Sequence, residues 1–368
     1  MGLEIIENIS HKYGANPSYV LAGGGNTSYK NDENLYIKGS GTQLATITAD
    51  GFVKMSREKL ARIWKNTYSK EQSKREAEVL ADMMGAKCEG EENKRPSVET
   101  LLHDLFTQTY VLHVHPTKVN GLTCSLGGKD IMEEMFPEAI WIEETEPGYT
   151  LAKKCRERIN EYEEKTGKKA NLLFLQNHGV FFAANSEEEM DSLVSYVMGK
   201  FDEKITTLPS LNELTYDESK VLSIIDAIKA VSDDGAFVKF TLNGEIARLA
   251  ESSQNFEILM RPMSPDHIVY CKALPLFVEN AEDITTNITD FEKTNGYKAK
   301  IIFVKGVGMF AVGINEKNAN VVSDVWLDAV KISVYANSFG GLRPMAPDMV
   351  DFIANWEVES YRSKVALK

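Results

Sequence analysis

The segment Tyr110–His115, YVLHVH, is a short apolar run that carries two of the chain's six histidines two residues apart. On a β-strand, residues i and i+2 point to the same face, so both imidazoles are expected to project into one site. His178 follows another apolar run and precedes a glycine. Three imidazoles with one open position form the ligand set of a catalytic zinc site. The sequence therefore predicts a metal site on His113, His115 and His178, although a single histidine taken alone is more often structural.

Outward from this strand, the sequence predicts alternating helices and strands. Pro96 and Ser97 carry start signals for a helix with an apolar stripe between Leu101 and Phe106. The apolar runs at 172–175 and 180–183 flank His178 as the arms of a β-hairpin would. The other expected elements are a strand at 35–38 and helices at 2–12, 70–84, 151–165 and from Ser186 to about Leu208, where Ser186 and Glu189 form a capping-box pattern.

The second half of the chain echoes the first. The segment 301–310 can be laid on 172–181, which brings Gly308 onto Gly179 and Val307 onto His178. The following segment, 318–339, is again predicted to be helical. We interpret this as a degenerate internal repeat that lacks the histidines, and convergence of two ordinary strand–turn–strand–helix units is the alternative.

The composition of the chain argues against several classes of function. The chain has 368 residues and a net charge of −13, which disfavours general nucleic-acid binding because phosphate neutralisation needs a basic surface. Its four cysteines form no CxxC pair and are expected to be reduced thiols. The N-terminus carries acids where a signal peptide carries Lys or Arg, and no apolar run reaches the roughly 18 residues of a membrane span. A cytoplasmic protein that binds no membrane is expected.

A glycine-rich turn precedes the strand at 35–38. Gly23–Ser28 reads GGGNTS, and glycines let the backbone approach a ligand closely while the flanking polar groups offer donors to an anion. The turn matches neither of the common nucleotide-binding glycine motifs. It indicates a phosphate or other anion only in combination with further motifs.

Taken in order, these motifs resemble the class II aldolase/adducin family. They are the GNTS turn at 25–28, a strand into Ser40-Gly41, PSVE at 96–99, the His-x-His strand, and Asn177-His178-Gly179. The resemblance covers about residues 4–205. It is closest to the aldolase part of the fused rhamnulose-1-phosphate aldolase/dehydrogenase type, which shows stretches similar to 38–41, 264–267 and 276–278. On that likeness the similarity covers nearly the whole chain, without the dehydrogenase part.

The resemblance implies both a fold and a set of site residues. The expected fold is a three-layer α/β arrangement around a mainly antiparallel sheet, with a catalytic domain at 1–205 and a second α/β domain at 206–368, the candidate degenerate repeat. The resemblance implies a divalent metal, zinc first among the candidates, on the three histidines, and Glu99 as the catalytic acid/base. The implied substrate-phosphate contacts are Gly25, Asn26, Ser40, Gly41 and Ser97. Val98 departs from fuculose-phosphate aldolases, which carry a second serine there.

The expected function is that of a metal-dependent aldolase. Such a lyase cleaves a phosphorylated ketose, for example rhamnulose or fuculose 1-phosphate, into dihydroxyacetone phosphate and an aldehyde. Breaking a carbon–carbon bond beside a ketone builds an enediolate, whose charge a Lewis acid stabilises while a nearby carboxylate moves the proton. The alternatives are epimerisation, decarboxylation or dehydration of a sugar phosphate on the same scaffold, and a non-catalytic adducin-like module.

Several residues keep a second interpretation. Glu99 is alternatively a first-turn acid that favours the helix dipole. His103 is interpreted as a surface residue, with a place beside the site as the alternative. His267 is interpreted as structural, with a contribution to a site from the second half, together with Asp266 and Lys272, as the alternative. His11 is interpreted as solvated. The resemblance also implies a homo-oligomer, either a dimer or a tetramer, with a sugar phosphate as the small-molecule partner.

Overall fold

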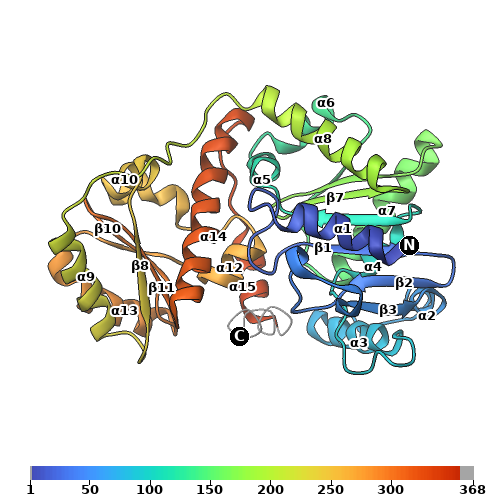
Figure 1. Ribbon diagram of the computed structural model, residues 1–368, viewed down its shortest axis with the longest axis horizontal. Coiled ribbons are helices and arrows are strands. Elements are labelled where there is room, and N and C mark those ends of the chain that lie inside the picture. The colour runs from blue at the N-terminus through green and yellow to red at the C-terminus, as the bar shows by residue number, and fades with distance from the viewer. Residues whose placement is uncertain (1, 357–368) are drawn as a thin grey trace. The chain divides into compact units, whose positions relative to one another are not determined.

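The structure is a computed structural model in which residues 2–356 are described. It separates into two compact units (Figure 1). The first comprises the residues up to Thr123 together with Gly128–Lys204, and the second comprises Cys124–Gly127 together with the residues from Ile205 onward. None of the helices in the described part of the chain has the length and apolar character that crossing a membrane requires.

A seven-stranded sheet forms the middle of the first unit, in the order β3-β2-β1-β4-β7-β6-β5. Its strands are β1 (Asn26–Lys30), β2 (Asn34–Lys38), β3 (Phe52–Ser56), β4 (Tyr110–Val114), β5 (Ile140–Ile142), β6 (Leu172–Leu175) and β7 (Gly179–Ala184). Neighbouring strands are antiparallel except for the parallel pair of β5 and β6. Strand β4 lies at the centre and every one of its residues is buried. The expected mainly antiparallel sheet is confirmed.

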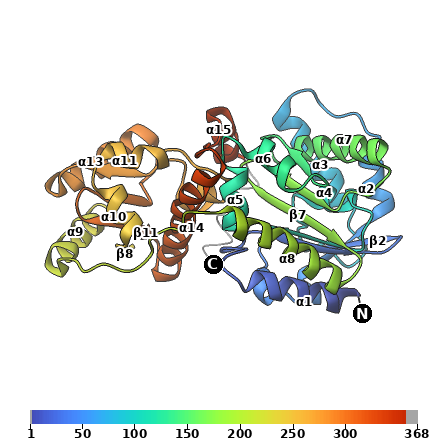
Figure 2. The same cartoon turned by 90° about the horizontal axis from the view of Figure 1, so that it is seen from above.

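Helices cover both faces of this sheet, which makes three layers (Figure 2). One face carries α1 (Gly2–Gly14) and α8 (Glu187–Lys204), and the other carries α2 (Arg57–Ile63), α3 (Gln72–Gly85), α4 (Thr100–Leu105) and α7 (Tyr149–Thr166). The shorter elements are η1 (Leu44–Thr46), η2 (Ala49–Gly51), α5 (Thr117–Thr123) and α6 (Gly128–Met135). The three-layer α/β arrangement is therefore confirmed as well.

A hydrophobic cluster joins the sheet to the α4 layer. Leu101 and Leu102 on α4 pack with Leu35 and Ile37 of β2 and with Phe181 of β7, and each of these side chains is at most 2% exposed. Burial of such a side chain contributes roughly 1.5–3 kcal/mol. The predicted apolar stripe thus fixes the helix that follows Glu99 against the sheet that carries the histidines.

One helix ends earlier than its sequence pattern indicates. Helix α8 begins at Glu187 but ends at Lys204, whereas the pattern extended to about Leu208. Thr206 and Thr207 are β-branched, and Pro209 disfavours a helical conformation at the residue before it. These local preferences stop the helix before the apolar pattern does.

The second unit contains a four-stranded sheet in the order β8-β11-β10-β9. Its strands are β8 (Phe237–Thr241), β9 (Leu276–Val278), β10 (Ile301–Val304) and β11 (Gly308–Gly313). Its helices are α9 (Glu218–Ala230), α10 (Gly244–Ala250), α11 (Ser253–Phe256), η3 (Glu257–Leu259), α12 (Pro265–Cys271), η4 (Ala281–Asp283), α13 (Ile284–Asn295), α14 (Glu316–Tyr335), η5 (Ala336–Phe339) and α15 (Pro347–Asn355).

This second sheet repeats the pairing of half of the first. In the order β8-β11-β10-β9, the first two pairs of neighbours are antiparallel and the last pair is parallel. The same holds for the order β4-β7-β6-β5 in the first sheet. The β10–β11 hairpin closes with Val304 opposite Gly308, as β6–β7 closes with Leu175 opposite Gly179. Each turn contains one residue of positive φ, Gly306 at 67° and Asn177 at 57°. We therefore propose that the second unit is a degenerate copy.

The equivalences show what the copy lacks. Phe240 of β8 pairs with Phe310 of β11 as His113 of β4 pairs with Phe181 of β7. Val307 donates its N–H to Val304 across 3.0 Å, as His178 does to Leu175 across 3.1 Å. Apolar side chains therefore stand where two of the three histidines stand in the first unit.

A buried lysine ties β1 to the end of α4. Lys30 is 5% exposed, and its Nζ donates to the carbonyl oxygens of His103 and Phe106, both at 2.7 Å. Burial lowers the pKa of Lys30 to about 7, against the opposing attraction of Asp104. Because this pKa lies below the ordinary value of 10.5 in the unfolded chain, the unfolded state binds more protons between the two values and stability rises with pH there.

This linkage predicts a pH dependence that Lys30→Met should remove. Between pH 7 and pH 9 the wild-type free energy of unfolding is expected to rise by about 2 kcal/mol relative to that of Lys30→Met. Denaturant titrations of both proteins at the two pH values measure the difference. A difference that stays constant across this window would show that Lys30 keeps its ordinary pKa in the folded protein.

Candidate metal centre

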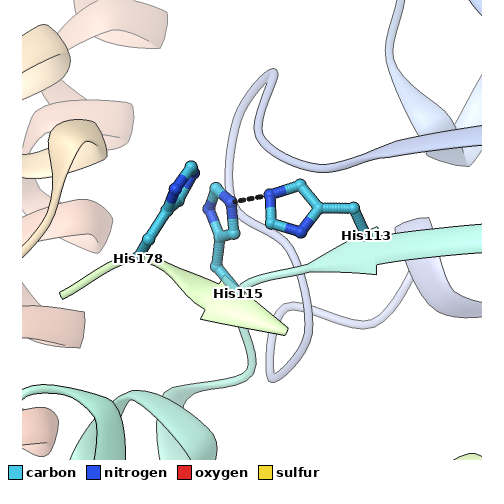
Figure 3. A group of neighbouring side chains, drawn as sticks. All are labelled: His113, His115 and His178. Atoms are coloured by element: carbon cyan, nitrogen blue, oxygen red, sulfur yellow. Dashed lines mark hydrogen bonds between the residues drawn. The ribbon is translucent and has the colours of Figure 1, made fainter. Parts of the chain in front are cut away.

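The histidine pair lies at the end of the central strand. His113 is fully buried on β4, and His115 follows the strand with its N–H bonded to the Tyr19 carbonyl at 3.0 Å. The two rings lie 4.8 Å apart between centroids. The same-face arrangement expected from their spacing brings both side chains to one point (Figure 3).

His178 reaches the same point from the β6–β7 turn. The positive φ of 57° at Asn177 turns the chain sharply, and the His178 ring comes within 5.0 Å of each of the other two rings, centroid to centroid. A Cβ on Gly179 would lie 2.6 Å from Cδ2 of His115 and from the Val114 carbonyl. The glycine after His178 is therefore required for the turn to fit beside the histidine pair.

The donor set fits a metal ion. One ring nitrogen from each histidine lies within 4.8 Å of the others, and this is the one such cluster among residues 2–356. Nδ1 of His113 bonds to the Val180 carbonyl at 3.1 Å, so Nδ1 carries the hydrogen and Nε2 presents its lone pair. Nε2 of His115 lies 3.0 Å from that atom, close to the roughly 3.3 Å that separates nitrogens around tetrahedral zinc.

A carboxylate borders the three histidines. Glu99 is the N-cap of α4, but its side chain makes no capping bond. Oε2 lies 3.4 Å from Nε2 of His113 and Oε1 lies 3.7 Å from Nε2 of His178. Glu99 is 7% exposed, and its Oε1 is buried without a hydrogen-bond partner. An unpaired buried oxygen costs free energy, and this one faces the His178 ring.

Asn26 joins Glu99 to the glycine turn. Its Nδ2 donates to Oε2 of Glu99 at 2.5 Å and to Oγ of Ser97 at 3.3 Å. Ser97 Oγ also accepts the Glu99 N–H at 3.2 Å, so its own hydrogen remains to be donated. Gly25 has a φ of 66°, and a Cβ there would lie 2.9 Å from the His113 carbonyl. Three of the residues implied for phosphate binding therefore lie beside the histidines.

The other two implied phosphate residues lie in the adjoining loop. The Ser40 N–H donates to the Arg95 carbonyl at 2.7 Å and Ser40 Oγ donates to the Pro96 carbonyl at 3.2 Å. Gly41 is exposed with a φ of 94°. The loop 39–41 thus runs next to the segment before Glu99. Among the described residues, no hydrogen bond joins Ser40 or Gly41 to the Asn26 side chain.

The interpretation of His103 as a surface residue is wrong. His103 is fully buried, with Nδ1 2.8 Å from Oγ of Ser28 and Nε2 bonded to Oδ1 of Asn26. Neither Ser28 nor His103 was selected from sequence as a site residue. The available signal was the four-residue spacing between Glu99 and His103, which places both on one face of a helix.

The other two histidines are not members of this cluster. His267 is 1% exposed and its Nδ1 lies 3.2 Å from Oγ of Ser264, in keeping with the structural interpretation. His11 is half-buried rather than solvated, because its Nε2 lies 2.6 Å from the Ile47 carbonyl.

The chain is similar to several known proteins. The family described as class II aldolase and adducin N-terminal domain matches residues 8–197. A curated protein of Bacillus subtilis (strain 168), named uncharacterized oxidoreductase YuxG, is 22% identical over 414 residues. The alignment covers 99% of this chain but 58% of that protein, so the chain spans less than two thirds of the relative's length.

The solved structures that match include a class II aldolase domain and an L-fuculose-1-phosphate aldolase. The N-terminal class II aldolase domain of a conserved protein from Thermoplasma acidophilum is 22% identical, with a TM-score of 0.47 and coverage of 56% of this chain and 94% of that domain. The L-fuculose-1-phosphate aldolase of Thermus thermophilus is 18% identical, with a TM-score of 0.35 and coverage of 55% of this chain and 90% of that one.

Proposed function

This chain belongs to the class II aldolase and adducin family, and from that premise we propose that it is a metal-dependent aldolase. The family inferred from the order of the sequence motifs is confirmed by the match over residues 8–197. The proposed reaction is the retro-aldol cleavage of a phosphorylated ketose, such as rhamnulose or fuculose 1-phosphate, into dihydroxyacetone phosphate and an aldehyde.

One observation carries the proposal. A buried carboxylate, Glu99, lies within 3.7 Å of Nε2 of both His113 and His178, in a cluster whose three ring nitrogens could hold a metal. A helix N-cap acid with only a structural role would bond to the backbone of its own helix, and Glu99 does not. A non-catalytic module has no need of a carboxylate in that position.

The bound ion, which we propose to be zinc on His113, His115 and His178, would supply a positive charge that stabilises the negative charge developing beside the breaking bond. Glu99 would move the proton. When the carbon–carbon bond breaks, its electron pair stays on the carbon next to the ketone, and the hydroxyl of the other fragment gives its proton to Glu99 and becomes the aldehyde. Glu99 would then return this proton to the carbon next to the ketone, which completes dihydroxyacetone phosphate.

Recognition of the phosphate group is proposed for the segment around the glycine turn. Ser97 retains a hydroxyl hydrogen for donation, because both of its contacts use Oγ as acceptor. The proposed phosphate site is completed by Gly25, Asn26, Ser40 and Gly41. It has one hydroxyl fewer than the site of fuculose-phosphate aldolases, because Val98 stands where those enzymes carry a second serine.

Product analysis on a panel of ketose 1-phosphates tests this function. The metal-loaded protein is expected to release dihydroxyacetone phosphate from at least one member, and chelation should stop the release. Glu99→Gln, prepared in parallel, controls for contaminating aldolase. Conversion of the substrate to an epimer, or loss of carbon dioxide or water without dihydroxyacetone phosphate, would indicate one of the alternative reactions. Protein that binds no divalent metal would indicate the non-catalytic module.

The assembly and location are also proposals. We propose a homo-oligomer, either a dimer or a tetramer, in the cytoplasm, and sedimentation equilibrium distinguishes these states from a monomer. In this oligomer the second unit would bind no metal of its own, because Phe240 and Val307 stand at the positions equivalent to the ligands His113 and His178.

A further inference from the structure

Alternate residues of β1 contact α4 from one end to the other. Asn26 bonds to Glu99 at the start of the helix, Ser28 to the His103 ring in its middle, and Lys30 to two carbonyl oxygens at its end. Residues i, i+2 and i+4 of a strand share one face. Helix α4 has only six residues, so these contacts, together with its apolar packing, determine where Glu99 lies.

The hydrogen bonds of His103 define its tautomer. Oδ1 of Asn26 can only accept, so Nε2 of His103 must carry the hydrogen that it donates there. Nδ1 then accepts from the Ser28 hydroxyl at 2.8 Å. Burial, assisted by the nearby His113 and Lys30, holds the pKa of His103 well below its ordinary value, so the ring is neutral. The Ser28 hydroxyl can donate or accept, and by donating here it supports the tautomer that Asn26 needs.

The Glu99 carboxylate, which can only accept, and this tautomer together orient the Asn26 amide. With Oδ1 held by His103, Nδ2 points to Oε2 of Glu99 at 2.5 Å and to Ser97. A flipped amide would set Oδ1 against the carboxylate oxygen and Nδ2 against the Nε2 hydrogen of His103, which is repulsive at both ends. The chain of bonds from Ser28 through His103 and Asn26 therefore admits one arrangement, in which Glu99 receives a donor.

We propose that Ser28 and His103 are positioning residues, which act through the Asn26 amide to hold the Glu99 carboxylate beside the three histidines. The inference rests on the proposed function of Glu99. The two added residues do not contact the ring nitrogens of the metal ligands, and because both are buried they cannot contact a substrate. An apolar side chain would fill the space beside Phe181 at lower desolvation cost, so packing alone does not account for a histidine with both ring nitrogens bonded.

The test compares four variants of the full chain. His103→Leu removes the donor to Asn26, and His103→Gln keeps an N–H donor. Ser28→Ala removes the hydroxyl that donates to Nδ1 of His103. Thr27→Val is the matched control. Thr27 precedes Ser28, its side chain is as fully buried as that of Ser28, and its hydroxyl bonds to Ser10 at 2.7 Å. Each is assayed for kcat, KM and cobalt(II) affinity.

The expected result is a loss of kcat without loss of metal. His103→Leu should lower kcat by about 10–100-fold, as the removal of outer-shell partners does, with KM and cobalt(II) affinity within about threefold of wild type. His103→Gln should recover most of that loss, Ser28→Ala should show a smaller loss in the same direction, and Thr27→Val should stay within about twofold. In a Glu99→Gln background, His103→Leu should have little further effect.

Three outcomes would overturn the proposal. They are a kcat of folded His103→Leu near that of wild type, a parallel loss of cobalt(II) affinity, and equal losses in Ser28→Ala and Thr27→Val. Nitrogen NMR of histidine-labelled protein tests the bonding without any substrate. Wild-type His103 should be neutral with its hydrogen on Nε2, and a hydrogen on Nδ1 would contradict the chain of bonds. If the wild-type protein cleaves no ketose but shows this NMR signal, the proposed aldolase function is wrong and the proposed chain of hydrogen bonds is supported.

Discussion

His178→Ala is expected to remove the metal and with it the activity, while the fold remains. The variant leaves two of three nitrogen ligands, so metal affinity should fall by more than the roughly 10–100-fold that loss of an outer-shell partner costs. Turnover should fall by at least about 10²–10³-fold, the scale on which removal of one electrostatic stabiliser acts. Elemental analysis of the purified protein, with about one ion per wild-type chain expected, and cobalt(II) titration measure the change.

His178 is a better position for this test than His113. The His113 side chain is fully buried and stacks on Phe181 at 4.1 Å between ring centroids, so His113→Ala would also leave a cavity in the core. The His178 side chain is 15% exposed in a turn. His11→Ala serves as the control, because it removes a half-buried imidazole outside the cluster. A His178→Ala protein that retains wild-type metal content would refute the three-histidine site.

Glu99→Gln is expected to keep metal and fold and to lose turnover by roughly 10²–10⁴-fold, the range for general acid–base groups. Glutamine has nearly the same shape, and its carbonyl oxygen can still accept the Nδ2 hydrogen of Asn26, but it cannot move a proton at this position. Exchange of the hydroxymethyl hydrogens of dihydroxyacetone phosphate in heavy water measures that proton transfer directly, and it should slow by a similar factor.

Glu76→Gln provides a matched control for this experiment. Glu76 is another nearly buried carboxylate of the first unit, 8% exposed, but it accepts from the Tyr149 N–H at 2.9 Å and lies outside the histidine cluster. Its substitution should leave turnover per folded chain within about twofold of wild type. If Glu99→Gln turned over its true substrate within a few-fold of wild type, Glu99 would be no more than a residue at the start of a helix.

The parts of the site that depend on local periodicity could be predicted from sequence. The spacing of His113 and His115 in an apolar run placed both imidazoles on one face of a strand, and the apolar runs around His178 predicted the hairpin of β6 and β7. The glycine after His178 marked a tight turn, although its steric reason, the approach of His115, is visible only in the structure.

The network behind Glu99 could not be predicted in this way. Nothing in the local sequence of α4, TLLHDL, predicts that His103 is buried, because histidine is intermediate among the residue types in how often it is buried. Its partners Asn26 and Ser28 lie more than seventy positions earlier in the chain. The distance between these residues in sequence is bridged only by the pairing of β1 with β4 and the packing of α4 on that face.

The sequence by itself determined the candidate metal ligands and most helices and strands, because these follow from side-chain spacing within short segments. It determined the class of fold through the resemblance of its motif order to a known family. Only the tertiary structure decided that Glu99 turns its carboxylate to the histidines and that His103 lies buried behind it. The physical reason is register. Asn26 lies opposite His113 in the β1–β4 pair, so the two ends of the site meet through backbone hydrogen bonds between strands that no local pattern in either segment specifies.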